Sequence, residues 1–224
     1  MNKLFIRETE KLKESLLRQA GEIESRLACV LKGVEMRDTA NLSILINLDH
    51  EIDVREVLIE EDCLKILALH QPVAKDLRFV IAVLKINNDL ERIGDTIINV
   101  ADRGIHLVPY PTPAILEKVM EMGMHIGTML NDSINSLVTL DLALAKSVLA
   151  KDDIVDDLNR NVVQTVIQQV KMPENLVNIE SFILVKSMAR DLERIGDHAT
   201  NIAEDVVYLM DGTIIRHNYN KNED

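Results

Sequence analysis

Oxygen-bearing side chains recur at matching positions in two parts of this chain of 224 residues. The segment Asp89–Asp95 is repeated unchanged as Asp191–Asp197, an offset of 102 residues. Around each copy, four side chains follow the spacing i, i+4, i+8 and i+11, which on a helix places them within about 80° of one another. Carboxylate and amide oxygens gathered on one helix face are ligands for a multivalent cation. The two sets are Glu91, Asp95, Asn99 and Asp102, and Glu193, Asp197, Asn201 and Glu204.

A further acidic set precedes each copy. In the first half it follows the spacing i, i+4, i+7 and i+11, and in the second half an acidic pair recurs at an offset of 103 residues. We therefore expect two neighbouring helices in each half, each with an acidic pair one turn apart. These residues are Asp49, Asp53, Glu56 and Glu60 in the first half and Asp152 and Asp156 in the second.

Two interpretations of these faces compete. Acidic residues opposite an apolar stripe usually form a solvated surface. Like charges one helical turn apart, however, cost about 0.2–0.5 kcal/mol per pair, and both halves keep this arrangement. Repetition of an unfavourable pattern favours cation binding. An oxygen-only site suits Mg²⁺, Mn²⁺, Ca²⁺ or ferric iron better than structural zinc, and the absence of Glu-x-x-His at either copy argues against a di-iron oxidase.

Six helices must position these side chains. Apolar residues at steps of three and four predict them, and the stripe through Phe79, Val83 and Ile86 steps by four and three without interruption. Long helices joined by short turns pack as antiparallel neighbours, so each half is predicted to be a three-helix bundle. The predicted helices cover about 3–36, 38–70, 73–107, 113–138, 141–170 and 174–210.

The segment Pro109–Pro113 is a strong linker signal, and it falls at the midpoint of the chain. It divides the chain into a first bundle at 1–108 and a second at 113–212, followed by a mobile tail at 213–224. Thr112 is predicted to be the N-cap of the fourth helix.

Two residue types inside the repeated segment have structural explanations. Gly94 and Gly196 each cost about 1 kcal/mol against Ala within a helix, so they indicate a close helix approach or room for a metal. Arg92 and Arg194 lie about 100° round the helix from the carboxylates. They are expected to form ion pairs with an acidic neighbour such as Asp89 or Asp191, or with another helix, rather than to hold a substrate.

Composition excludes several classes of function. Hydrophobic residues make up 47% of the chain, and aromatic residues only 3%, which is typical of an all-helical protein with a core. The formal net charge of −12 disfavours nucleic acid and anionic lipid as partners. The longest apolar run, Phe79–Leu84, is too short for a membrane span, and the charged N-terminus does not resemble a signal peptide. A soluble cytoplasmic protein is expected.

The chain resembles the PhoU family of phosphate-uptake regulators over nearly its whole length. The likeness is carried by His70–Arg78, similar to the family's Gln-Pro-x-x-x-Asp-Leu-Arg turn, by the two Leu-Glu-Arg-Ile-Gly-Asp segments with their trailing Asn, and by the acidic pairs before them. The second half departs from this pattern, since it has only Met172-Pro173 at the turn and Asn159 where the first half has Glu56.

This resemblance implies a fold of two tandem three-helix bundles and a function. It implies a multinuclear metal cluster, of iron or zinc, with manganese or magnesium in some members, and no enzymatic activity. The implied partners are a phosphate-importing ABC transporter and a membrane sensor histidine kinase, and the implied role is negative regulation of phosphate uptake as a homodimer. The implied ligands are Asp49, Asp53, Glu91, Asp95, Asn99, Asp102, Asp152, Asp156, Glu193, Asp197, Asn201 and Glu204.

Two alternatives remain on the sequence alone. Clustered metals can activate water, so a metal-dependent hydrolase or oxidoreductase is one, although no Ser, Cys or His constellation lies near either acidic set. A purely structural helical scaffold with hydrated acidic faces is the other.

Overall fold

The structure, a computed structural model, describes residues 3–48, 50–172 and 178–212. Within these residues it contains long helices and no strand, which confirms the predicted all-α class. None of these helices combines the length and apolar character that crossing a membrane requires. The helices are α1 (Lys3–Met36), α2 (Thr39–Asn47), α3 (His50–His70), α4 (Ala74–Leu107), α5 (Leu116–Thr139), α6 (Leu142–Gln169) and α7 (Ile179–Asp211).

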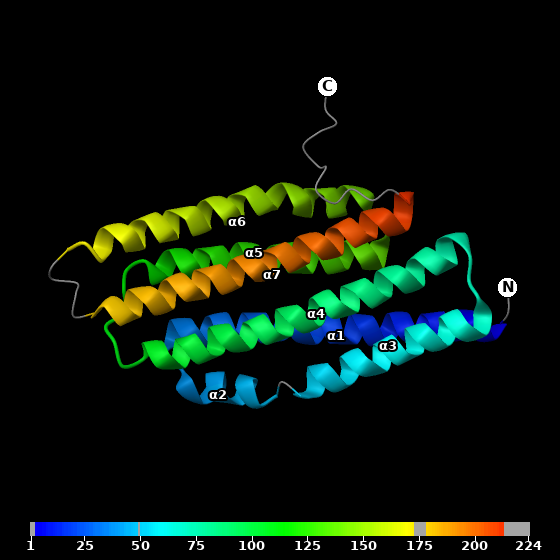
Figure 1. Cartoon of the computed structure of the whole chain (residues 1–224), viewed down its shortest axis with the longest axis horizontal. Helices are drawn as coiled ribbons and strands as arrows, with labels where there is room; N and C mark the ends of the chain where they lie inside the picture. The colour runs from blue at the N-terminus through cyan, green and yellow to red at the C-terminus, as the bar shows by residue number, and fades with distance from the viewer. Residues whose placement is uncertain (1–2, 49, 173–177, 213–224) are drawn as a thin grey trace, which may run out of the picture.

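The two repeated helices, α4 and α7, pack side by side at the centre of the molecule (Figure 1). The first bundle consists of α1, α4 and the broken rod α2–α3, and the second consists of α5, α6 and α7. In Figure 1, α3 and α6 lie at opposite edges, while α1 and α5 lie behind the central pair. The tandem three-helix bundles predicted from the sequence are therefore confirmed.

One apolar core runs through both bundles. In α4 the predicted stripe is buried, with Val83, Ile86 and Leu90 at 0% exposure, and in α7 the matching Val185 and Leu192 are equally buried. The predicted boundary at 108/113 falls in the connection between α4 and α5. The core nevertheless continues across it, so the two halves share their packing. The tail predicted at 213–224 lies outside the described residues.

The prediction of a single helix over 38–70 is wrong, because α2 ends at Asn47 and α3 begins at His50. Leu42 of α2 is fully buried against two glycines. A Cβ at Gly33 would lie 2.7 Å from the Cδ2 of Leu42, and one at Gly104 would lie 3.0 Å from its Cδ1. This close packing holds α2 near α1 and α4, whereas α3 packs through larger isoleucines and lies further away. One straight helix cannot meet both packing distances.

Helix caps explain where several elements begin. The carboxylate of Asp38 accepts a hydrogen bond from the backbone N–H of Asn41 at 3.1 Å and so caps the start of α2. The prediction that Thr112 caps the fourth helix is wrong, since α5 begins at Leu116. The Thr112 hydroxyl instead accepts a hydrogen bond from Arg37, which also donates to the backbone of the linker.

Candidate metal centres

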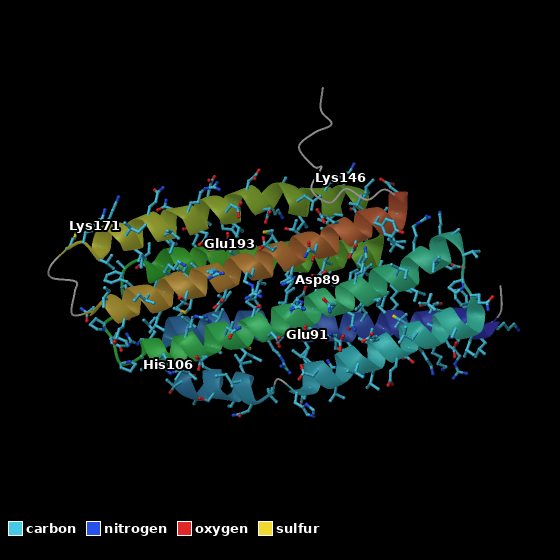
Figure 2. The ribbon with its side chains drawn as sticks, in the orientation of Figure 1. Asp89, Glu91, His106, Lys146, Lys171 and Glu193 are labelled. Atoms are coloured by element: carbon cyan, nitrogen blue, oxygen red, sulfur yellow. The ribbon has the colours of Figure 1, made fainter. Side chains whose placement is uncertain are left out.

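The first candidate centre lies where α3 packs on α4. One carboxylate oxygen from each of Asp53, Glu91 and Asp95 lies within 4.8 Å of the other two. Asp53 comes from α3, and Glu91 and Asp95 come from consecutive turns of α4. Figure 2 shows Glu91 on the side of α4 that faces α3. The structure thus brings together three of the predicted ligands from two helices.

The environment of Glu91 disfavours its charged form. Burial raises the pKa of Glu91, and the nearby Asp95, Glu56 and Asp53 raise it further, against a smaller opposing effect of Arg92. Burial also raises the pKa of Glu56, with additional contributions from Glu60 and Asp53. A multivalent cation among these groups would remove the repulsion.

Not every predicted ligand joins the trio. The amide of Asn99 donates to the backbone oxygen of Asp95 at 3.1 Å. Asp102 is exposed, and its carboxylate lies 3.5 Å from Nδ1 of His106, one turn further along α4. Asp49 lies outside the described residues, so its predicted role remains a prediction.

The second candidate centre lies between α6 and α7. Its four carboxylates are Asp152 and Asp156 on α6, and Glu193 and Asp197 on α7. Asp197 is exposed at the surface, but the protein around it partly removes its carboxylate from water. This desolvation raises the pKa of Asp197 to about 6, together with repulsion from Asp152, Glu193 and Asp156. Burial and then Asp156 also raise the pKa of Asp152. The carboxylates of the second centre therefore repel one another, as those of the first centre do.

The second centre is more open than the first. Within the described part of the chain, the trio of the first half is the one group of three acidic, His or Cys side chains whose candidate ligand atoms all lie within 4.8 Å. In the second half, Thr200 donates to Asp152 at 3.3 Å, and the amide of Asn201 donates to Asp89 of α4 at 3.3 Å. Sequence reasoning did not identify Thr200, because the first half has Ile98 at the equivalent position.

Asn159 gives a further indication of a ligand. It follows Asp156 by three residues on α6, where the first half has Glu56 after Asp53. Its buried Oδ1 has no hydrogen-bond partner among the described residues. An unsatisfied buried acceptor is costly, and coordination by a cation would satisfy it. The sequence identified this residue as a departure from the acidic pattern, whereas the structure shows an oxygen without a partner.

The donor chemistry fits some metals better than others. Carboxylates and amide oxygens supply all the candidate ligands, and no Cys or His joins them. This set suits ferric iron, Mn²⁺ or Mg²⁺, and it lacks the Cys and His ligands of most structural zinc sites.

A cavity of about 660 Å³ connects the two halves between the centres. Asn87 lies in its wall with 1% exposure and donates from Nδ2 to the backbone oxygen of Glu56 at 2.9 Å. Its Oδ1 has no hydrogen-bond partner in the part of the chain that the structure describes. Helices α3, α4, α6 and α7 all contribute polar residues to the lining, among them Glu56, Glu60, Asp89, Asp152, Asp197, Asn201 and Glu204.

Polar contacts also join α4 to α7 directly. The first aspartate of each repeated segment contacts the other helix: Asp89 lies 2.8 Å from Nδ1 of His198, and Asp191 forms an ion pair with Arg103. Figure 2 shows Asp89 between the two helices. The prediction that Arg92 and Arg194 pair with these aspartates is therefore wrong. His198 and Arg103, which have no equivalent in the other repeat, take that role.

The two repeated glycines differ in their surroundings. A Cβ at Gly94 would lie 3.1 Å from Cδ1 of Ile52 and 3.2 Å from Cδ1 of Ile23, so α4 approaches its neighbours closely there. At Gly196 the nearest atom, Cγ1 of Val155, would lie at 3.5 Å, an ordinary contact. The predicted close approach is confirmed at Gly94 only.

Comparison with known proteins follows the same division into halves. Residues 16–104 and 119–206 each match the family model described as the PhoU domain. A similar protein from Aquifex aeolicus, named "Phosphate-specific transport system accessory protein PhoU homolog", is 35% identical over 99% of each chain. A relative of the same name from Deinococcus radiodurans is 34% identical over 88% of this chain and 92% of its own.

Solved structures show the same fold. The crystal structure of PhoU from Pseudomonas aeruginosa matches with a TM-score of 0.90 and 33% identity, covering 93% of this chain and all of that one. The phosphate transport system regulatory protein PhoU from Streptococcus pneumoniae matches with a TM-score of 0.86 and 28% identity, over 94% of this chain and 98% of its own.

Proposed function

The chain belongs to the PhoU domain family, and from that membership we propose that it is an accessory protein of a phosphate transport system that binds metal ions at two acidic centres. The curated relatives described above are named as accessory proteins of that system, and similarity extends over nearly the full length of both chains. The proposal assigns the chain a regulatory role without catalysis.

The observation that carries the metal-binding part is the convergence of Asp53, Glu91 and Asp95 within 4.8 Å. Three carboxylates at this separation repel one another strongly unless a cation lies among them. The second centre repeats the charge pattern, and the pKa of Asp197, about 6, is raised first by burial and then by the same kind of repulsion. The bound metals would neutralise the facing helices and so draw α3 to α4 and α6 to α7. Iron or zinc clusters are proposed from the family resemblance, with manganese or magnesium as alternatives; the oxygen-only donors favour iron over zinc.

The regulatory part follows from the family. The chain would act in the cytoplasm, as a homodimer, between the phosphate ABC transporter and a sensor histidine kinase, and would restrain phosphate uptake when phosphate is abundant. Names of the relatives support the link to transport. The net charge of −12 supports contact with a basic protein surface rather than with nucleic acid or anionic lipid.

Metal content and phenotype test the two parts separately. Protein purified without chelator should contain metal by inductively coupled plasma measurement. The fourfold variant Glu91→Ala/Asp95→Ala/Glu193→Ala/Asp197→Ala should contain much less. Equal metal in both would refute the assigned centres. A deletion strain whose alkaline phosphatase activity and phosphate uptake are unchanged at high phosphate would refute the regulatory role.

A further inference from the structure

Helix α3 is apolar on two opposite sides. One side packs into the core through Ile52, Ile59 and Cys63, all at most 1% exposed. The other side faces away from α1 and α4, at the edge of the molecule in Figure 1, and also carries large apolar residues. These outward residues, here called the outer stripe, are Val54, Val57, Leu58, Leu64 and Leu69, with exposures of 46%, 50%, 55%, 54% and 64%.

The outer stripe follows one face of α3 and is interrupted by Glu61 and Lys65. At 100° per residue, its five members fall within about 140° of one another, centred opposite the buried face. From Val54 to Leu69 the stripe extends about 22 Å along the helix. Scattered exposed apolar residues are normal on protein surfaces, but a stripe of this length on one helix face marks a contact surface.

The second repeat provides an internal comparison. Helix α6 occupies the position of α3, and at the offset of 103 residues Val54, Val57 and Leu58 correspond to polar residues that are all exposed. These are Asp157, Arg160 and Asn161, the first two joined to each other by an ion pair. Leu64 and Leu69, by contrast, correspond to Ile167 and Met172, which are also exposed, at 47% and 41%. The apolar character that α3 has and α6 lacks is therefore confined to Val54, Val57 and Leu58.

The charges around the outer stripe determine what can cover it. Glu60 and Asp62 flank it on either side, and Glu61 lies within it; none of the three forms an ion pair among the described residues. The helix's own cations turn towards α1, because Arg55 pairs with Glu22 and Lys65 Nζ lies 3.1 Å from Glu8. The stripe is thus left as an apolar strip with uncompensated negative charge.

We infer that the outer stripe of α3 binds a basic amphipathic helix of a partner protein. Leu or Ile side chains of that helix would cover the stripe, and its Lys or Arg side chains would face Glu60, Glu61 and Asp62, as in other helix-in-groove contacts. A second copy of this chain would bring the same acids against one another, and an anionic membrane would meet the same negative charge. The inference deepens the adaptor role proposed above, on which it rests for the existence of a protein partner.

A synthetic peptide supplies the direct test. The peptide has about 18 residues of Leu and Lys in an amphipathic-helix pattern, enough to cover the stripe. Its affinity for the full chain is measured by fluorescence anisotropy. The variant Val54→Asp/Val57→Arg/Leu58→Asn, which takes its residues from α6 and leaves the net charge unchanged, should weaken binding about tenfold or more. Circular dichroism should show that it folds normally, since all three positions are exposed.

Matched controls distinguish binding at the outer stripe from non-specific hydrophobic or electrostatic binding of the peptide. Met36→Gln/Met124→Gln removes two exposed apolar residues from α1 and α5 and should leave the affinity unchanged. Glu61→Gln/Asp62→Asn should lower the peptide affinity and make it less dependent on salt concentration. Asp153→Asn/Asp157→Asn on α6 should change neither quantity appreciably.

Three results would overturn the inference. They are wild-type affinity in the threefold variant, equal binding of a peptide in which Glu replaces Lys, and equal binding of phosphatidylglycerol vesicles. Metal content of the threefold variant is measured in parallel. A normal metal content with lost peptide binding supports the docking surface. If wild-type protein purified without chelator contains no metal and yet binds the peptide through α3, the metal centres are refuted and the docking surface stands.

Discussion

His198 of α7 lies with its Nδ1 2.8 Å from Oδ1 of Asp89 on α4, so a side chain beside one candidate centre contacts the first residue of the other repeated segment. Asn201 donates to the same carboxylate oxygen at 3.3 Å. Further along the two helices, Asp191 pairs with Arg103, and Lys85 with Asp205 at 2.9 Å. The two centres are therefore joined through a polar seam along α4 and α7.

Loss of Arg103 should destabilise the protein. Its partner Asp191 is only 5% exposed, and burial already raises the pKa of that carboxyl group despite the nearby Arg103. Arg103→Met would leave this carboxylate buried and unpaired, at an expected cost of about 2 kcal/mol in the free energy of unfolding in urea. The control Arg92→Met removes an exposed guanidinium and should change it by less than about 0.5 kcal/mol. Equal effects of the two variants would contradict the role of the Asp191–Arg103 pair.

Alanine at the two repeated glycines should have opposite effects on stability. Helix propensity favours alanine by about 1 kcal/mol at both positions. At Gly94 the new methyl group would press on Ile52 and Ile23, and overpacking of this kind costs about 1–3 kcal/mol, so Gly94→Ala should lower the thermal midpoint. Gly196→Ala has room beside Val155 and should raise it. Calorimetry of the two metal-free variants measures both thermal midpoints. A change of the same sign in both would show that the helices do not pack more closely at Gly94 than at Gly196.

Metal affinity should depend on Asp53 more than on Asp102. Asp53→Asn removes one of three converging carboxylates. Loss of a residue that only supports a metal ligand already lowers metal affinity roughly tenfold, so loss of a ligand should lower it at least as much. Asp102→Asn removes the same charge from the same stripe but outside the trio and should have little effect. Titration of chelator-treated protein with Mn²⁺ or ferric iron measures both. A larger loss with Asp102→Asn would place the metal further along α4.

The metal-free protein should become more stable as the pH falls from 7 to 5. The pKa of Asp197 is about 6 in the folded protein against an ordinary value of 3.8, so the folded state binds the proton more readily than the unfolded state. The penalty of its charge is complete above pH 6 and disappears as the pH falls towards 4. Asp152, Glu91 and Glu56 have raised pKa values and act in the same direction.

A thermal midpoint measured across this pH range, with chelator present, tests the effect. Asp197→Asn should remove part of the pH dependence, because Asn does not titrate. With metal present the trend should reverse, since protons compete with the cation for the same oxygens. A metal-free midpoint that falls steadily between pH 7 and 5 would show that the carboxylates of the second centre do not repel one another as described.

Much of this architecture could be predicted because it depends on periodicity. The stripe of α4 follows from Val83, Ile86 and Leu90 alone, and the exact repeat of Asp89–Asp95 indicates the tandem bundles. The break between α2 and α3 could not be predicted, since it depends on Leu42 meeting Gly33 and Gly104, which are distant in the sequence.

The candidate centres show the same limit. Helical spacing predicts that Glu91 and Asp95 share a face, but the approach of Asp53 depends on how α3 packs on α4. Spacing also included Asp102, which is not one of the three carboxylates that converge; its role as a ligand stays a prediction. The repeated segment could not predict that the two candidate centres differ, because Thr200 and Asn159 lie outside it.

The contacts between α4 and α7 are reciprocal, since the first aspartate of each repeated segment reaches across to the other helix. The isologous interface of a symmetric dimer pairs equivalent residues, and here the two aspartates are equivalent while their partners, His198 and Arg103, are not. A half-length polypeptide with a single copy would present this surface to its twin, so gene fusion would have converted an intermolecular seam into an internal one. Once covalently joined, the copies were free to diverge, and one outer helix could carry Val54, Val57 and Leu58 where its counterpart carries Asp157, Arg160 and Asn161.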